Sequence, residues 1–229
     1  MQRLPSAAHR FPGLSTLDVT FLAASKKVQN LLNRLQHITG LRSLGMYYTL
    51  SQLPVGQQFM LQQSQLTSFR ASSLEYNAEA GVLDTFLHKA TILQSLVTLD
   101  LDLSNSVTDA AVRDLSHLTK LQSLRLHVSK DDASISGRSM TAFTQLTQLT
   151  HLSLQGWPLH DVHVAMMTAL TNLRKIDMSM CQSLSSLSFM PLLQFPQLTA
   201  LDIVRYDEWA EDAIVTMFEM LKPQVKLGL

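Results

Sequence analysis

Apolar positions follow one short phrase that recurs along the chain. The phrase is a leucine, two residues, an apolar residue, one residue and a further small or apolar residue. Its eight copies begin, 24 to 30 residues apart, at Leu14, Leu41, Leu66, Leu96, Leu121, Leu149, Leu173 and Leu198. A period of this length held over eight copies indicates a repeat architecture, in which each repeat needs its neighbours to close its core.

Each repeat combines two kinds of spacing. The last two apolar positions of the phrase are two residues apart, which is the period of a strand with one buried face. Between the phrases, helical spacing of apolar residues predicts helices over 28–38, 82–90, 164–170 and 214–221. Because helices are wider than the spacing between strands, we expect parallel strands inside, helices outside and a curved stack.

This phrase and its period resemble the leucine-rich-repeat family. The resemblance implies an α/β leucine-rich-repeat solenoid, or horseshoe, with a parallel concave sheet and outer helices in about eight repeats. We expect a short lead over 1–13, repeats over 14–207, and a C-terminal helix with a candidate ninth strand over 208–229. The thin ends predict a monomer or a segment of a longer array.

The family places Asn or Cys eight residues after the first leucine, where the side chain satisfies backbone groups at the turn. Here the position holds Leu22, Thr49, Leu74, Ser104, Ser129, Trp157, Cys181 and Tyr206. Only Cys181 keeps a family residue, and we expect it to be buried. Trp157 and Tyr206 are interpreted as aromatic anchors for a partner, lying just beyond their strands.

The fourth repeat reads LVTLDLDLSNSVTDAAVRDLSHLTKL and resembles the cysteine-containing subclass of F-box/leucine-rich-repeat proteins. Thr108 or Asp109 would cap the following helix through a side-chain oxygen, and Asp161 takes a similar place two repeats later. The resemblance implies one alternative function, the substrate-recognition part of an SCF-type E3 ubiquitin ligase.

Side chains that alternate with the buried apolar residues point to the concave face. They form a polar surface with charges of both signs, on which Tyr and Arg are the residue types favoured at binding hot spots. The candidate partner-binding residues are Tyr47, Arg70, Asp100, Asp102, Arg125, His127, His151, Gln155, Lys175, Asp177 and Asp202.

Composition narrows the partner class. Lysine plus arginine and aspartate plus glutamate both total 18, so the formal net charge is zero and a generic nucleic-acid surface is not expected. No apolar run reaches the roughly 18–20 residues of a membrane span, so no membrane partner is expected. With a single cysteine, the chain is predicted to work in the cytoplasm, with the nucleus or a cilium as alternatives.

Catalytic chemistry is not predicted. His160 and His163 are three residues apart, but no further ligand except Asp161 accompanies them, whereas structural zinc needs four. Phosphate-binding and metalloprotease motifs are missing from the sequence, so no catalytic residue, metal or cofactor is expected. The leading hypothesis is a protein–protein interaction scaffold that binds a partner protein on its concave sheet. A structural component of a ciliary or cytoskeletal assembly is a further alternative.

Overall fold

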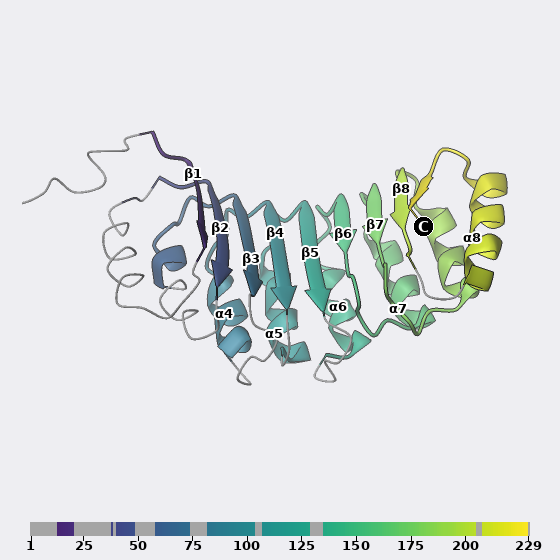
Figure 1. The fold of residues 1–229 in the computed structure, drawn as a ribbon, viewed down its shortest axis with the longest axis horizontal. Coiled ribbons are helices and arrows are strands. Elements are labelled where there is room, and N and C mark those ends of the chain that lie inside the picture. The colour runs from purple at the N-terminus through teal and green to yellow at the C-terminus, as the bar shows by residue number, and fades with distance from the viewer. Residues whose placement is uncertain are drawn as a thin grey trace, which may run out of the picture.

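The computed structural model describes residues 13–20, 38, 40–48, 58–73, 82–103, 107–128, 135–204 and 208–228. Within this part the strands form one parallel sheet in chain order (Figure 1). They are β1 (Thr16–Thr20), β2 (Ser43–Tyr48), β3 (Ser68–Ser73), β4 (Thr98–Leu103), β5 (Ser123–Val128), β6 (His151–Ser153), β7 (Lys175–Asp177), β8 (Ala200–Asp202) and β9 (Lys226–Gly228). The strand β9 extends the sheet beyond the eighth phrase.

The strand register follows the repeated phrase. The second apolar position of each phrase pairs with the same position in the next, for example Leu44 with Phe69 and Leu99 with Leu124. These side chains are buried at 0–1% exposure from β2 to β8. The first leucines of the second to eighth phrases are equally buried, so one hydrophobic core runs along the stack. The predicted solenoid is confirmed.

Helices line the other side of the sheet (Figure 1). The α-helices include α4 (Val82–Ala90), α5 (Asp109–Asp114), α6 (Met140–Phe143), α7 (Asp161–Met166) and α8 (Glu208–Leu221), and residues 58–61 are also helical. The 3₁₀ helices are η2 (Leu115–His117), η3 (Gly137–Ser139), η4 (Met167–Ala169) and η5 (Ser186–Gln194). Three of the helices expected from spacing are therefore present, whereas the one expected over 28–38 lies almost wholly outside the described residues.

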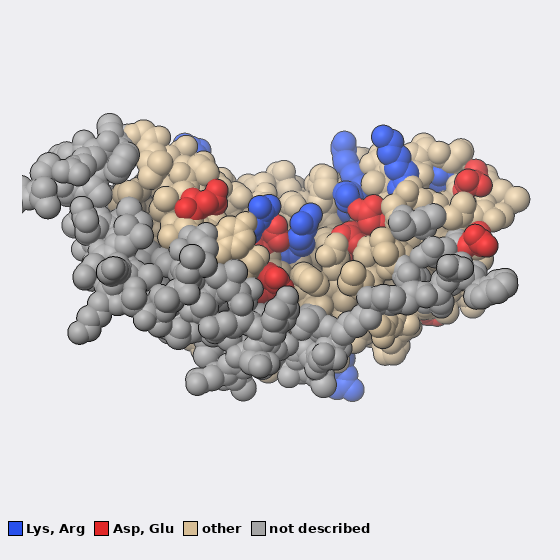
Figure 2. All heavy atoms as spheres, viewed as in Figure 1, with Lys and Arg blue, Asp and Glu red and all other residues tan. Residues whose placement is uncertain are grey.

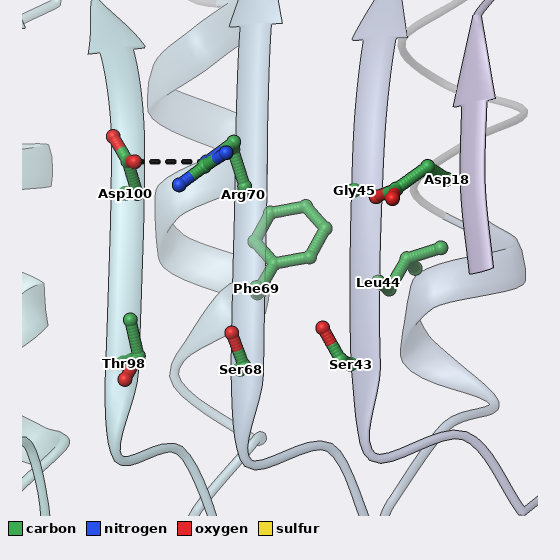
Figure 3. Close-up of a pocket in the computed structure, with 9 residues that line it drawn as sticks. All are labelled: Asp18, Ser43, Leu44, Gly45, Ser68, Phe69, Arg70, Thr98 and Asp100. Carbon is green, nitrogen blue, oxygen red and sulfur yellow. Dashed lines mark hydrogen bonds and ion pairs between the residues drawn. The ribbon is translucent and has the colours of Figure 1, made fainter. Parts of the chain in front are cut away.

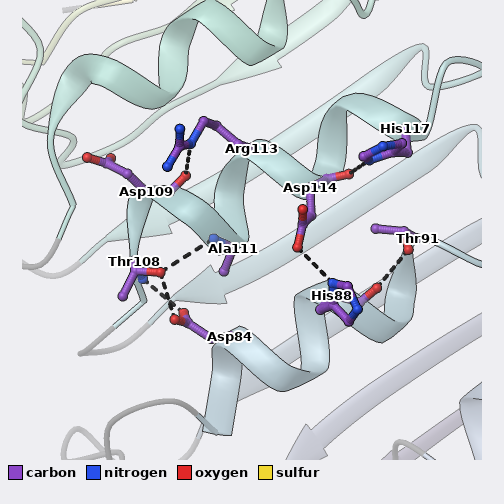
Figure 4. A network of polar contacts seen from close by, with 9 residues as sticks. All are labelled: Asp84, His88, Thr91, Thr108, Asp109, Ala111, Arg113, Asp114 and His117. Atoms are coloured by element: carbon purple, nitrogen blue, oxygen red, sulfur yellow. Dashed lines mark hydrogen bonds and ion pairs between the residues drawn. The ribbon is translucent and has the colours of Figure 1, made fainter.

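At three junctions a carboxylate on one helix binds the residue that precedes the helix of the next repeat. Asp84 on α4 accepts hydrogen bonds from the backbone N–H of Thr108 at 2.9 Å and from its hydroxyl at 2.7 Å (Figure 4). Asp109 binds Ser136 in the same way, at 3.0 and 2.5 Å. Thr108 in turn caps α5 by accepting from the N–H of Ala111. Of the two residues expected to cap α5, Thr108 is therefore the cap, whereas Asp109 contacts the following repeat.

Asp161 belongs to the same series, so the expectation that it caps its own helix was wrong. The residue before α7 is His160, and Asp161 is the first residue of the helix. Its carboxylate accepts from the backbone N–H and hydroxyl of Ser185 and from the hydroxyl of Ser188. These donors lower the pKa of Asp161 to about 2. The residue thus stabilises the junction with the following repeat.

At the junction between Gly137 and His160, a histidine ring takes the place of the carboxylate. Gly137 stands where the other repeats have Asp109 or Asp161, and it has no side chain to receive the next N–H. The ring of His163 takes that space, because a Cβ on Gly137 would lie 2.0 Å from the ring. His163 Nδ1 accepts from the backbone N–H of His160 at 2.9 Å. Burial is the main cause that lowers the pKa of His163, so the neutral, accepting ring is favoured.

Candidate binding face

One row of side chains crosses the whole sheet on the face opposite the core. Strand pairing places its members side by side, because each occupies the same position in its strand. In order from β1 to β9 they are Asp18, Gly45, Arg70, Asp100, Arg125, Ser153, Asp177, Asp202 and Gly228. Figure 2 shows charged side chains gathered in the middle of this face and again toward its C-terminal end. The rows two residues before and after it carry the other candidate partner-binding residues.

The centre of the face holds two arginines that share one carboxylate. Arg70 Nε lies 2.9 Å from Asp100 Oδ2, and Arg125 Nη1 lies 4.0 Å from the same oxygen. Asp100 is the main cause that raises the pKa of Arg70, and the side chain of Tyr47 raises it further. The two arginine side chains remain 57% and 55% exposed. They therefore present cationic groups to solvent from a rigid sheet.

A shallow hollow of about 270 Å³ lies beside these arginines. Its walls are Tyr47, Arg70, Ser72, Asp100, Leu101, Asp102, Arg125, His127 and Gln155. Asp102 Oδ1 lies 3.6 Å from His127 Nδ1, and burial is the first cause that raises the pKa of Asp102. The structure thus brings seven candidate residues from the sequence around one hollow, together with the hydroxyl of Ser72.

The candidate residues of the C-terminal half are engaged with one another. Lys175 Nζ lies 2.7 Å from Asp202 Oδ2. Asp177 is 6% exposed and accepts hydrogen bonds from the Ser153 hydroxyl at 3.0 Å, the Gln155 amide at 2.6 Å and the backbone N–H of Ser179 at 3.0 Å. Its carboxylate therefore stabilises the sheet and positions the Gln155 side chain.

His151 stands apart from the other candidates. It is exposed at the start of β6, pairs with Ser123 in the sheet, and its Nδ1 lies 2.8 Å from the hydroxyl of Thr150. Because His127 is four residues further along β5, about 13 Å separates the two histidines along the strands. His151 is therefore a surface residue at the margin of the face.

The aromatic residue Trp157 is not an anchor, and that expectation was wrong. Its indole is fully buried and lies against Phe143, with ring centroids 5.9 Å apart. The indole Nε1–H donates to the carbonyl oxygen of Leu126 at 3.0 Å. The expected burial of Cys181 is confirmed, and its thiol lies 3.1 Å from the carbonyl oxygen of Leu154.

Trp157 and Cys181 therefore make equivalent hydrogen bonds in successive repeats. Each occupies the position eight residues after the first leucine, and each donates to the carbonyl of the third apolar residue in the preceding repeat. The indole thus replaces the Asn or Cys of the family at this position. Its polar N–H signals this role, because a buried indole usually finds a hydrogen-bond acceptor. The other aromatic candidate, Tyr206, lies outside the described residues.

A second hollow, of about 180 Å³, opens over the glycine of β2 (Figure 3). Its lining residues are Asp18, Ser43, Leu44, Gly45, Ser68, Phe69, Arg70, Thr98 and Asp100. Only Arg70 and Asp100 were expected from sequence to contribute to a site. A glycine in the middle of a strand was the available signal, since it marks a place where another group can approach the backbone.

Two further features of the described part bear on its chemistry. No group of three or more His, Cys, Asp or Glu side chains in those residues is arranged to hold a metal ion. None of the helices described is long and apolar enough to cross a membrane.

Comparison with known proteins supports the fold. No protein-family profile matches the sequence, and no curated protein sequence matches it either. Among solved structures, the chain is similar to yeast Rad7 in its complex with Elc1, with a TM-score of 0.63 and 18% identity over 96% of this chain and 64% of that one. It is also similar to TLR13 in complex with ssRNA13, with a TM-score of 0.54 and 18% identity over 95% and 32% of the two chains.

Internalin C2 from Listeria monocytogenes is a third structural neighbour, at a TM-score of 0.46 and 17% identity over 95% of this chain and 75% of that one. The parallel sheet in chain order and the likeness to Rad7 and TLR13 give the fold class, a leucine-rich-repeat solenoid. The chain spans about two thirds of the Rad7 chain and one third of the TLR13 chain.

Proposed function

We propose that this protein is a protein–protein interaction scaffold that binds a partner protein on the concave face of its sheet. The observation that carries the proposal is the charged cluster of Arg70, Asp100 and Arg125 beside Tyr47. Arginine and tyrosine are, with tryptophan, the residue types enriched among the hot spots of protein interfaces. Here the sheet sets the backbone positions of these residues, so no loop has to be ordered when a partner binds.

Affinity capture with matched variants tests this proposal. We expect the full chain to capture a defined set of partners from native lysate, and the triple variant Arg70→Ser, Asp100→Ser, Arg125→Ser to lose them. The control variant Lys120→Ser, Arg138→Ser, Glu219→Ser removes the same number of each charge from exposed positions outside the strands. Unaltered partners in the concave variant, or equal loss in the control, would count against the concave face.

A second candidate function is the substrate-recognition part of an SCF-type E3 ubiquitin ligase. It is supported by the resemblance of the fourth repeat to F-box/leucine-rich-repeat proteins. In this repeat Thr108 caps α5. Similarity to Rad7, which was solved with Elc1, is compatible with this proposal at the level of fold. Co-purification with a ligase core would support it, and a captured set without ligase subunits would contradict it.

We further propose a non-enzymatic, cytoplasmic protein that binds neither nucleic acid nor membrane. The even balance of 18 basic and 18 acidic residues supports the absence of a nucleic-acid surface. The buried thiol of Cys181 suits a reducing compartment. Localisation of a tagged chain tests the compartment and also the alternative of a ciliary or cytoskeletal assembly. Fluorescence anisotropy with labelled single-stranded RNA tests the exclusion of nucleic acid, since titratable binding at 0.15 M salt would contradict it.

A further inference from the structure

The hollow over β2 is formed by a carboxylate that leans across a glycine. Asp18 and Gly45 are paired residues of β1 and β2, and a Cβ on Gly45 would lie 2.0 Å from Asp18 Oδ1. The carboxylate therefore occupies space that any other residue at position 45 would fill. Figure 3 shows it at one wall of the hollow, with Arg70 at the opposite wall.

Asp18 is the only carboxylate on the concave face of the described strands without a charged or hydrogen-bonding partner there. Asp100 is shared by two arginines, and Asp102 faces a histidine. Asp177 accepts three hydrogen bonds, and Asp202 pairs with a lysine. The negative charge of Asp18 is therefore available to a ligand in this part of the chain.

Arg70 does not neutralise Asp18 across the hollow. Its guanidinium turns the other way and binds Asp100 at 2.9 Å, as the dashed line in Figure 3 shows. The two strands that carry Asp18 and Arg70 are two strand spacings apart, or about 10 Å. This width accepts one extended side chain, and the hydroxyls of Ser43 and Ser68 line the hollow as additional acceptors.

The opposite end of the same row shows what such a carboxylate binds. Asp202 leans over Gly228 as Asp18 leans over Gly45, since a Cβ on Gly228 would lie 2.3 Å from Asp202 Oδ1. There the ammonium of Lys175 lies 2.7 Å from Asp202 Oδ2. Lys175 comes from β7, on the side of Asp202 away from the glycine, so a carboxylate that leans over a glycine binds a lysine here through its other oxygen.

We propose that the hollow over Gly45 receives a basic side chain, a lysine or arginine, from an extended segment of the partner protein, and that Asp18 binds its charge. The glycine lets the Asp18 carboxylate lie close to the sheet beside the hollow, where it and the neighbouring hydroxyls can accept several N–H donors at once. This inference rests on the proposed function, because it assigns one recognition point on the face that binds the partner.

Capped pentapeptides with a central residue between glycines are the probes. We expect peptides with central lysine or arginine to shift the amide NMR signals of Ser43, Gly45 and Ser68 in the ¹⁵N-labelled full chain, saturably and less at high salt. Peptides with central norleucine or glutamate should leave these signals unchanged, because they lack the cation. Saturation by the norleucine peptide, or shifts confined to Asp102 and His127, would overturn the assignment.

Two variants separate the carboxylate from the space beside it. Asp18→Asn keeps the shape and should weaken binding of the lysine peptide by about 1.5- to 5-fold, as expected for loss of an exposed ion pair. Gly45→Ala should also weaken it, because the new Cβ would displace the Asp18 carboxylate from its place over the glycine. Asp202→Asn is the matched control and should bind as the wild type does. The melting temperature of each variant is measured first, and binding is compared among variants whose melting temperature equals that of the wild type.

The result for Asp18→Asn can be distinguished from the result for the triple variant of Arg70, Asp100 and Arg125. Partners that are lost from the triple concave variant but retained by Asp18→Asn would preserve the proposed function and contradict this inference. If the lysine peptide binds at Asp18 while the triple variant keeps all its partners, the hollow is a basic-residue site and the central arginines are not the binding surface.

Discussion

Trp157 offers a direct test of how the repeats are held together. Its indole is completely buried, it contacts Phe143, and its N–H donates to the Leu126 carbonyl of the preceding repeat at 3.0 Å. The substitution Trp157→Phe keeps an aromatic ring in the core but removes this donor and part of the side-chain volume. We expect the variant to fold and to lose stability at this junction.

The expected loss follows from two contributions. A buried carbonyl left without its donor costs about 1–3 kcal/mol. Truncation of a buried tryptophan to alanine costs about 3–5 kcal/mol, so replacement by phenylalanine, which keeps most of the volume, contributes about 1 kcal/mol. The free energy of unfolding should therefore fall by about 2–4 kcal/mol. At about 2–4 °C per kcal/mol for a chain of this size, the melting temperature should fall by roughly 4–16 °C.

Urea unfolding followed by far-UV circular dichroism measures this change without depending on indole fluorescence. Cys181 supplies the control, because its thiol lies 3.1 Å from the carbonyl oxygen of Leu154 in the preceding repeat. Cys181→Ser keeps a donor and should be less destabilising than Cys181→Ala. A loss below about 0.5 kcal/mol for Trp157→Phe, at an unchanged urea dependence, would refute the role of the indole as a hydrogen-bonding core residue.

Three other predictions test the repeat register and its junctions. Leu124→Ala, at a side chain only 1% exposed, should cost about 2–5 kcal/mol in urea unfolding, and wild-type stability would contradict the register. Gly137→Ala should lower the free energy of unfolding by about 1–3 kcal/mol, because the new Cβ crowds the His163 ring. In a double-mutant cycle, most of this loss should disappear when His163 is also replaced by alanine, whereas additive losses would contradict the contact. Hydrogen bonds from Ser185 and Ser188 hold the pKa of Asp161 at about 2, so its ionised form contributes fully above the unfolded pKa of about 3.9 and is lost as pH falls through about 2. The stability difference between wild type and Asp161→Asn should shrink from pH 4 to pH 2, whereas a constant difference would exclude this mechanism.

The sequence predicts the strands well because their signal is local. Leu99 and Leu124 pair directly in the sheet, as their equivalent places in the phrase require. Apolar spacing also locates α4 at Val82–Ala90. Each of these features depends on residues a few positions apart, which the buried face of one strand or one helix constrains together.

Contacts between repeats are harder to predict. The Asp161–Ser185 and Trp157–Leu126 hydrogen bonds join residues 24 and 31 positions apart. Each depends on how far one repeat is displaced against the next, which no local pattern reports. For the same reason, the sequence alone predicted an exposed anchor at Trp157 and a helix cap at Asp161. Both predictions were wrong because these side chains contact the neighbouring repeat. The pairing of Lys175 with Asp202 depends on the same stacking.

These internal pairings decide where a partner can gain most from the concave face. An exposed ion pair such as that of Arg70 with Asp100 contributes about 0.2–1 kcal/mol, so a partner carboxylate can redirect the arginine at little cost. The buried Asp177 cannot be redirected in this way, because three donors would lose their acceptor. A partner would therefore find adaptable charges on β3 to β5 and an unpaired carboxylate on β1, but a fixed hydrogen-bonded surface around Asp177. On this physical ground, recognition should concentrate on the N-terminal half of the face.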